Sequence, residues 1–224
     1  MTDRSLLRQR LTDGLRTLDV ALPLTGVERL LDYVDLLMRW NSAYNLTAVR
    51  DPAQIIPRHL LDSLAIAAYV QGATLADLGS GAGLPGIPLA VLAPDRQFLL
   101  VDANGKKARF LREAVRRLEL ANVRVAECRV EEVTGSFDCI CARAFASLAE
   151  MLAWGGRLLA PEGRWLAMKG RFPQDELGAV TGGFRIDTVH ALTVPGLDAE
   201  RHLVVIKRTD FGLGRTDPVP QDVQ

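Results

Sequence analysis

The sequence has few cysteines, few histidines and no long apolar run, and each shortage excludes a class of protein. The three cysteines, Cys128, Cys139 and Cys141, form no C-x-x-C pair, so neither a disulfide framework nor a zinc site is expected. The three histidines are scattered and match no metal-ligand spacing. No segment approaches the roughly 18 apolar residues of a membrane span, and the N-terminus lacks a signal-peptide core. These absences predict a cytoplasmic protein with reduced thiols, no bound metal and no membrane partner.

An excess of charge is missing as well. Lysine and arginine together number 27, as do aspartate and glutamate, so the formal net charge is zero at pH 7. The whole chain therefore gives no hint of a polyanionic partner, and any basic surface must be local. The length of 224 residues is enough for one domain with a sizeable core and a modest extension.

The hydrophobic pattern divides the chain near residue 70. Before that point, apolar residues at helical spacing predict helices at about 4–18, after an N-cap at Thr25, and at about 51–70. The asparagine-rich segment 40–47 is expected to break the second helix. We therefore expect a helical extension over 1–70, a second domain over 71–209 on which it packs, and a polar, disordered tail over 210–224.

After residue 70, predicted strands alternate with predicted helices, which is typical of a parallel sheet covered on both faces. The strands are expected near 74–78, 97–102, 123–127, 137–142, 163–169, 184–193 and 202–208. The helices are expected near 84–93, 105–120, 147–154 and 174–181. Only the loop 194–200 joins the last two strands, so they should pair antiparallel. The predicted fold is α/β, with a Rossmann-like, seven-stranded, mostly parallel sheet and an N-terminal helical cap.

A glycine-rich turn follows the first predicted strand, with an acid at Asp77 and glycines at Gly79, Gly81 and Gly83. Glycines at alternate positions let the backbone approach a ligand, and the helix that follows presents free N–H groups to it. The dinucleotide fingerprint G-x-G-x-x-G does not fit, because the third glycine comes one residue early and Leu84 follows it. The spacing resembles motif I of class I S-adenosylmethionine-dependent methyltransferases. A carboxylate at Asp77 suits the amino end of that donor, whereas beside a pyrophosphate it would repel.

Three further positions fit an adenosine-bearing ligand. Asp102 ends the second strand, where an acid can accept both ribose hydroxyls, although it could also cap the next helix. Val130 and Glu131 follow the third strand, where backbone groups would meet the adenine edge. The order of seven strands with a terminal hairpin, as in class I methyltransferases, supports the same donor independently of the glycines.

Basic side chains gather beyond the second and fifth strands. Lys106, Arg109 and Arg112 are spaced three residues apart on a predicted helix, and their shared face could hold a phosphate backbone or simply be solvated. Lys169 and Arg171 end the fifth strand at the edge of the sheet where substrates meet the donor.

Arg143 follows the fourth strand at that same edge, and both substrate binding and a structural salt bridge are open for it. The fourth strand lacks the Asn/Asp-Pro-Pro-Tyr box of amino-methylating enzymes. Cys139 and Cys141 also lack the Pro-Cys setting of cytosine C5 enzymes, so we do not expect a covalent nucleophile.

Six segments in the right order resemble one family, RsmG, the small-subunit ribosomal RNA methyltransferases also called glucose-inhibited division protein B. The segments are Trp40-Asn41-x3-Asn45-Leu46-Thr47, Arg58-His59-x2-Asp62-Ser63-Leu64, the glycine turn 77–86 with its Leu-Pro-Gly extension, Lys106-Lys107-x2-Phe110-Leu111, Arg143-Ala144-Phe145-Ala146 and Arg201-His202-Leu203-Val204-Val205-Ile206. The resemblance covers residues from about 28 to 208.

The resemblance implies transfer of a methyl group from S-adenosyl-L-methionine to N7 of one guanine, position 527 in the customary RNA numbering, in the decoding region of 16S rRNA. The residues it places at the donor site are Gly79, Leu84, Asp102, Val130, Glu131 and Arg143. Arg143 is also the residue expected to act in catalysis. Arg58, His59, the basic helix, Lys169 and Arg171 become expected RNA contacts, with 16S rRNA or the 30S subunit as partner of a monomeric enzyme.

Three alternatives stay open beside this interpretation. A methyltransferase acting on another RNA, a small molecule or a protein would share the donor site. An NAD-dependent oxidoreductase is disfavoured by the glycine spacing and by the lack of an evident acid or base for hydride transfer. A scaffold that binds donor or RNA would have no turnover.

Overall fold

The computed structural model describes residues 3–144 and 146–209 of the chain. The prediction of a disordered tail over 210–224 concerns residues outside these ranges.

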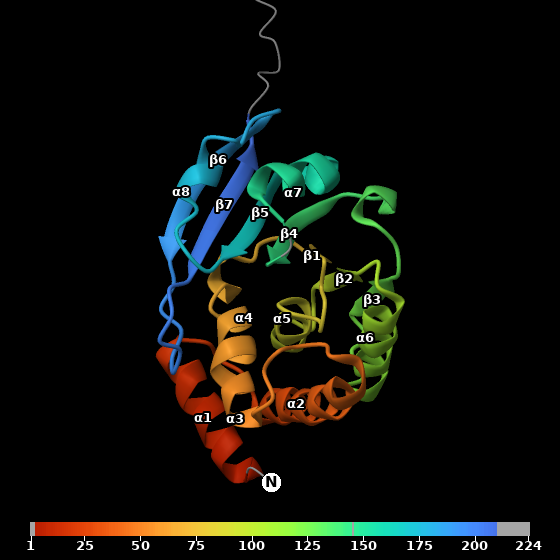
Figure 1. Ribbon diagram of the computed structural model, residues 1–224, viewed down its shortest axis with the longest axis vertical. Coiled ribbons are helices and arrows are strands. Elements are labelled where there is room, and N and C mark those ends of the chain that lie inside the picture. The colour runs from red at the N-terminus through yellow and green to blue at the C-terminus, as the bar shows by residue number, and fades with distance from the viewer. Residues whose placement is uncertain (1–2, 145, 210–224) are drawn as a thin grey trace, which may run out of the picture.

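One seven-stranded sheet forms the centre of the fold, in the order β3-β2-β1-β4-β5-β7-β6 (Figure 1). All neighbouring strands pair in parallel except β7, which runs antiparallel to both β5 and β6. The strands are β1 (Thr74–Leu78), β2 (Gln97–Val101), β3 (Val123–Ala126), β4 (Phe137–Arg143), β5 (Leu159–Lys169), β6 (Phe184–Ala191) and β7 (His202–Arg208). The predicted α/β fold with a terminal antiparallel hairpin is confirmed.

Apolar side chains alternate between the two faces of this sheet, and each face has its own core. Leu75 and Cys139 pack into the core that also holds the N-terminal helices, whereas Ala76, Ile140 and Trp165 pack into the opposite core. This follows from the two-residue period of a strand, which sends neighbouring side chains to opposite faces. Because both faces of the sheet are buried, its central strands are apolar along nearly their whole length.

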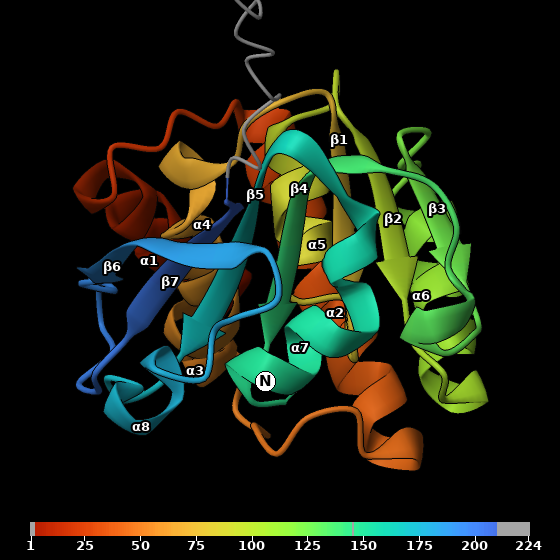
Figure 2. The ribbon, with the colours of Figure 1, turned by 90° about the horizontal axis from the view of Figure 1, so that it is seen from above.

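Helices cover both faces of the sheet (Figures 1 and 2). On one side lie α5 (Gly86–Leu92), α6 (Gly105–Arg117) and the N-terminal helices, and on the other lies α7 (Leu148–Gly155). The short α8 (Gln174–Leu177) precedes β6. The 3-10 turns are η2 (Ala67–Tyr69), η3 (Val130–Glu132) and η4 (Gly156–Leu158).

The N-terminal segment is a helical cap that shares a core with the sheet. It consists of α1 (Arg4–Thr17), α2 (Leu24–Tyr44), α3 (Pro52–Ile55), the π-helix η1 (Ile56–Leu61) and α4 (Asp62–Leu64). Tyr33 and Trp40 of α2 both contact the ring of Phe110 on α6, with centroids 6.3 and 5.7 Å apart. Because the two segments share one core, the division at about residue 70 stays a prediction.

The cap differs from its prediction in two ways. α2 begins at Leu24 directly after Pro23, so Thr25 is not its N-cap, and it ends at Tyr44, inside the asparagine-rich segment. Stacking of Trp40 on Tyr44, with centroids 5.1 Å apart, continues the packing that holds this end in a helix. The predicted helix at 51–70 is instead broken into short α, π and 3-10 pieces.

Candidate active site

The glycines in the turn between β1 and α5 have two different roles: one is required for packing and another borders open space. Gly79, Gly81 and Gly83 all have positive φ angles, of 73°, 59° and 86°. A Cβ at Gly83 would lie 2.4 Å from Ile87, so this glycine is needed for packing. A Cβ at Gly81 would meet nothing closer than the Gly79 carbonyl at 3.9 Å. The backbone at Gly81 therefore borders open space, as a ligand cradle requires.

Asp77 lies beneath this turn and is fully buried. Its Oδ2 accepts a hydrogen bond from the Gly86 N–H at 2.9 Å, while its Oδ1 has no partner among the described residues. Burial raises the pKa of this carboxyl to about 7. The side chain is absent from the linings of both cavities described below, so its expected contact with the donor stays a prediction.

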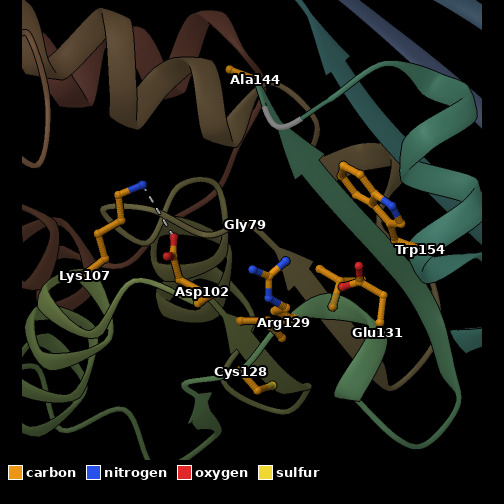
Figure 3. A pocket seen from close by; sticks show the side chains of 11 residues that line it. Gly79, Asp102, Lys107, Cys128, Arg129, Glu131, Ala144 and Trp154 are labelled. Carbon is orange, nitrogen blue, oxygen red and sulfur yellow. Dashed lines mark ion pairs between the residues drawn. The ribbon is translucent and has the colours of Figure 1, made fainter.

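A cavity of about 470 Å³ opens beside the turn at the carboxyl ends of β1, β2 and β3 (Figure 3). Its lining residues are Gly79, Val101, Asp102, Ala103, Lys107, Cys128, Arg129, Val130, Glu131, Ala144 and Trp154. We call it the nucleoside cavity, because it contains the acid and the strand end that the sequence analysis assigned to an adenosine.

Asp102 links the nucleoside cavity to the glycine turn. Its Oδ2 accepts the Gly81 N–H at 2.9 Å and its Oδ1 accepts the Asn104 N–H at 2.8 Å, while Lys107 Nζ lies 3.7 Å from Oδ2. The alternative role of Asp102 as helix cap is wrong, because Asn104 is the N-cap of α6 and accepts from Lys106 N–H. Asp102 thus has backbone partners that fix its carboxylate at the cavity wall.

The opposite wall comes from η3 and α7. Val130 is buried and Glu131 is exposed, and both line the cavity. Arg157 holds this turn, since its guanidinium donates to the carbonyls of Val133 at 2.7 Å and Glu131 at 2.6 Å. Sequence reasoning missed Arg157, which nothing in the local pattern distinguishes from a solvated arginine.

A second cavity of about 490 Å³ lies between the glycine turn, the cap and the ends of β4 and β5. Its lining residues are Leu46, Thr47, Val49, Arg58, His59, Asp62, Gly79, Ser80, Gly81, Ala82, Leu84, Lys107, Arg143, Ala144, Met168, Lys169, Gly170 and Arg201. We call it the basic cavity, because its lining contains five lysines and arginines and one carboxylate. The two cavities share Gly79, Lys107 and Ala144, so they meet beside the glycine turn.

Arg143 reaches into the basic cavity and also forms an ion pair. Its Nη1 lies 3.0 Å from Asp62 Oδ2 and donates to the Arg58 carbonyl at 3.3 Å. Arg201 Nε lies 2.7 Å from the other oxygen, Asp62 Oδ1. Asp62 is 2% exposed, so a nearly buried carboxylate joins two arginines from distant parts of the chain. Asp62 and Arg201 carried no predicted role, although both stand in the family-like segments quoted above.

His59 is held as a neutral imidazole at the wall of the basic cavity. Burial, followed by the nearby Arg143 charge, lowers its pKa to about 4. Its Nδ1 lies 2.8 Å from the Arg58 carbonyl, and its Nε2 lies 2.7 Å from Thr47 Oγ1. With Nδ1–H donating to the carbonyl, Nε2 accepts the threonine hydroxyl, and both ring nitrogens are satisfied.

The other predicted RNA contacts are divided between this site and its surroundings. Lys169 lines the basic cavity and pairs with Glu176 at 2.8 Å. Lys106, Arg109, Arg112 and Arg171 are exposed and lie outside both linings. Arg112 pairs with Glu127 at 2.7 Å. The structure therefore brings Arg58, His59 and Lys169 to the site and leaves the basic helix face beside it.

The two cysteines of β4 are buried, and no metal-binding cluster is found among the described residues. Burial raises the pKa of the Cys139 thiol to about 12 and raises the pKa of the Cys141 thiol well above its usual value, so both stay protonated near neutral pH. Residues 3–144 and 146–209 hold no cluster of three or more metal-ligating side chains. None of their helices is long and apolar enough to span a membrane.

Comparison with solved structures shows the same fold. The ribosomal protein L11 methylase from Lactobacillus delbrueckii subsp. bulgaricus matches with a TM-score of 0.53 and 21% identity, over 66% of this chain and 77% of that one. TrmN from Thermus thermophilus matches with a TM-score of 0.51 and 21% identity, over 66% of this chain and 47% of that one. At this level of identity the likeness shows a shared α/β fold.

Sequence comparison is more specific. The family model described as GidB, rRNA small subunit methyltransferase G, matches residues 26–204. A protein of Xanthomonas campestris pv. campestris (strain 8004) named ribosomal RNA small subunit methyltransferase G is 57% identical over 181 residues, which are 80% of this chain and 85% of that protein. The protein of the same name from Pseudomonas fluorescens (strain Pf0-1) is 47% identical over 203 residues, 90% of this chain and 95% of that protein. The chain therefore belongs to the GidB family of rRNA small subunit methyltransferase G proteins.

Proposed function

We propose that the protein transfers a methyl group from S-adenosyl-L-methionine to N7 of a single guanine, position 527, in 16S rRNA. The observation that carries the proposal is the meeting of the nucleoside cavity and the basic cavity at Gly79, Lys107 and Ala144. One cavity suits the adenosine of the donor, the other suits a nucleotide of the RNA, and the reacting atoms meet where the two join. An RNA substrate in turn supports a cytoplasmic location.

The nucleoside cavity fits the donor on the chemistry of its walls. The Asp102 carboxylate uses one hydrogen bond on each oxygen and keeps further lone pairs for the ribose hydroxyls. Gly79 lines this cavity, and the open space at Gly81, where the basic cavity begins, leaves room for the methionine end beside the turn. The turn at Val130 and Glu131 offers backbone groups to the adenine. When bound, the donor supplies an electrophilic methyl group on its sulfonium.

The basic cavity fits a reaction that needs no general base. Guanine N7 has a free lone pair at neutral pH, so no proton has to be removed before attack. His59 is neutral and has both nitrogens engaged, and Asp62 is engaged by two arginines. The chain's contribution is therefore orientation, holding N7 in line with the methyl group about 3 Å away, which can supply several kcal/mol.

Arg143 has a restricted role in this scheme. A hydrogen bond from its guanidinium to N7 would occupy the attacking lone pair and block the reaction. Its partners are instead guanine O6, a phosphate or the donor's carboxylate. Its position at the end of β4, beside the shared wall residue Ala144, brings it close to the place where the cavities join.

The charge of the basic cavity supports a polyanionic substrate. The lining contains five cationic residues and one carboxylate, although the whole chain has no net charge; the residues are Arg58, Lys107, Arg143, Lys169 and Arg201, with Asp62. Such local focusing attracts RNA, and binding through phosphates weakens as salt rises.

Incubation with labelled donor and free 16S rRNA, 30S subunits or 70S ribosomes tests the proposal. We expect label in the rRNA of at least one substrate, lost on ribonuclease treatment, and located by mass spectrometry at N7 of one guanine. Label in protein or small molecules without RNA would favour the alternative substrates. Donor binding without transfer would favour a scaffold, and binding of NAD in place of the donor would refute the site assignment.

A further inference from the structure

In the basic cavity, Arg143 and Arg201 pair with Asp62, and Arg58 contacts Arg143 through its backbone carbonyl; we call these four residues the Asp62 cluster. Arg143 and Arg201 each pair with a separate oxygen of the Asp62 carboxylate, at 3.0 and 2.7 Å. Arg58 joins them through its backbone carbonyl, which accepts from Arg143. Its residues come from the cap, from the end of β4 and from the position just before β7. These segments are distant in the sequence and meet only in the folded protein.

The cluster has more positive charge than Asp62 neutralises. The guanidinium of Arg58 donates only to the neutral amide oxygen of Gln54, at 3.3 Å, among the described residues. The four residues therefore carry three positive charges and one negative charge, and only two of the arginines pair with the carboxylate. The two lysines of the cavity differ, because Lys107 and Lys169 each have an acid beside them, at 3.7 and 2.8 Å. The surplus charge of the cavity is thus concentrated at the arginines.

The arginines also keep donors free for a ligand. Nε and Nη2 of Arg143, and Nη2 of Arg201, make no hydrogen bond to the described residues. The two side chains are 21% and 24% exposed, so these groups are accessible from the cavity. Two guanidinium groups held on one carboxylate present planar forks side by side, an arrangement that suits the oxygens of a phosphate.

We propose that the Asp62 cluster is a preformed site for one phosphate group of the RNA backbone next to the target guanosine. Asp62 holds Arg143 and Arg201 in place before the RNA arrives, which lowers the entropy lost on binding. The inference rests on the proposed function for the identity of the RNA, and its chemistry is that of a phosphate diester. Arg143 then positions the nucleotide through its phosphate and leaves N7 free to react.

Salt-dependent binding of an rRNA fragment tests the site. Arg201→Gln removes one phosphate contact and keeps a polar side chain. We expect about five-fold weaker binding at 0.1 M KCl and a slope of log K against log salt that is smaller by about 0.7. The matched control is Arg185→Gln on β6, an exposed arginine paired with Asp187 outside both cavities, which should change neither value. An unchanged slope in Arg201→Gln, or an equal change in the control, overturns the proposal.

The substitution Asp62→Asn distinguishes a preformed phosphate site from nonspecific electrostatic attraction of RNA to the cavity. The substitution makes the cavity one charge more positive, so general attraction predicts tighter binding. A preformed site predicts weaker binding, because both arginines lose their charged partner. Thermal unfolding first checks that the variant folds. If it does not fold, the Arg201→Gln comparison decides alone.

Inorganic phosphate distinguishes failure of this inference from failure of the proposed function. Nuclear magnetic resonance titration of the Arg Nε–H signals with phosphate, without RNA or donor, should shift those of Arg143 and Arg201 in the normal protein and lose the Arg143 response in Asp62→Asn. Such shifts without rRNA methylation would retain the anion site and refute the function. Methylation with no shift of either signal would refute the anion site.

Discussion

The buried carboxyl of Asp77 gives a prediction whose magnitude follows from its surroundings. Its pKa is about 7 in the folded protein and 3.8 in an unfolded reference. A raised folded-state pKa means that the folded protein keeps a proton that the unfolded chain releases. The stabilising effect is therefore complete below pH 3.8 and is lost as the pH rises to about 7. At about 1.4 kcal/mol per pH unit, the loss is about 4 kcal/mol.

Asp77→Asn removes this dependence, because the amide does not titrate and its oxygen can still accept the Gly86 N–H. The free energy of unfolding of the variant minus that of the normal protein should increase by about 3 kcal/mol between pH 4 and pH 7. Urea unfolding at one-unit intervals measures it.

Asp138→Asn is a control of opposite sign. Hydrogen bonds from Thr74 and Ala73 lower the pKa of Asp138 in the folded protein. Its stabilising effect is present above the unfolded-state pKa and is lost as the pH falls. The free energy of unfolding of this variant minus that of the normal protein should therefore decrease as the pH rises towards 4 and change little between pH 4 and pH 7. A pH-independent difference for Asp77→Asn would refute the reasoning about its burial.

Three substitutions test the donor site and the catalytic residue. The Tyr33 hydroxyl donates to the Ala82 carbonyl in the glycine turn at 2.7 Å, so Tyr33→Phe should cost about 1–2 kcal/mol of stability and weaken donor binding about five-fold by calorimetry. Unchanged donor affinity would mean that the cap does not position the turn. Asp102→Ala should weaken donor binding about 100-fold through two lost charge-assisted hydrogen bonds, and a change below three-fold would refute ribose binding. Arg143→Ala should lower kcat roughly 10- to 100-fold in rRNA methylation assays with the fold intact by circular dichroism, and unchanged turnover would remove its catalytic role.

Most of the sheet was predictable because most strands are short apolar runs with clear boundaries, but β5 begins at Leu159, four residues before its predicted start, because its first half contains a proline, a glutamate and a glycine. β1 and β7 match their predicted ranges, and β2 ends one residue early. The cap was less predictable, since α2 extends to Tyr44 and its Trp40 packs on Phe110 of α6, a contact that only the folded chain creates. Local propensity yields to tertiary packing in such segments.

Part of the candidate site was also predictable from the sequence, and part was not. Asp102 and the glycine turn follow from spacing within some 25 residues, and the structure joins them through the hydrogen bond from Gly81. The pairing of Asp62 with Arg201 spans 139 positions, which no periodicity encodes. Their residue types stood in recognisable segments, yet only tertiary structure shows that they share an ion pair. The place of Asp77 beneath the turn was equally hidden, because an acid at a strand end has the same sequence pattern whether buried or exposed.

The ion pairs of Asp62 also set an order of events during synthesis. The carboxylate comes from residue 62 and its partners from residues 143 and 201, so the cavity is incomplete until nearly all of the described chain has left the ribosome. While it is still attached to the ribosome, a nascent chain would therefore lack the complete Asp62 cluster that we propose for RNA binding. We expect ribosome-bound chains stalled before residue 201 to show no specific retention of rRNA fragments, and a released full chain to acquire it.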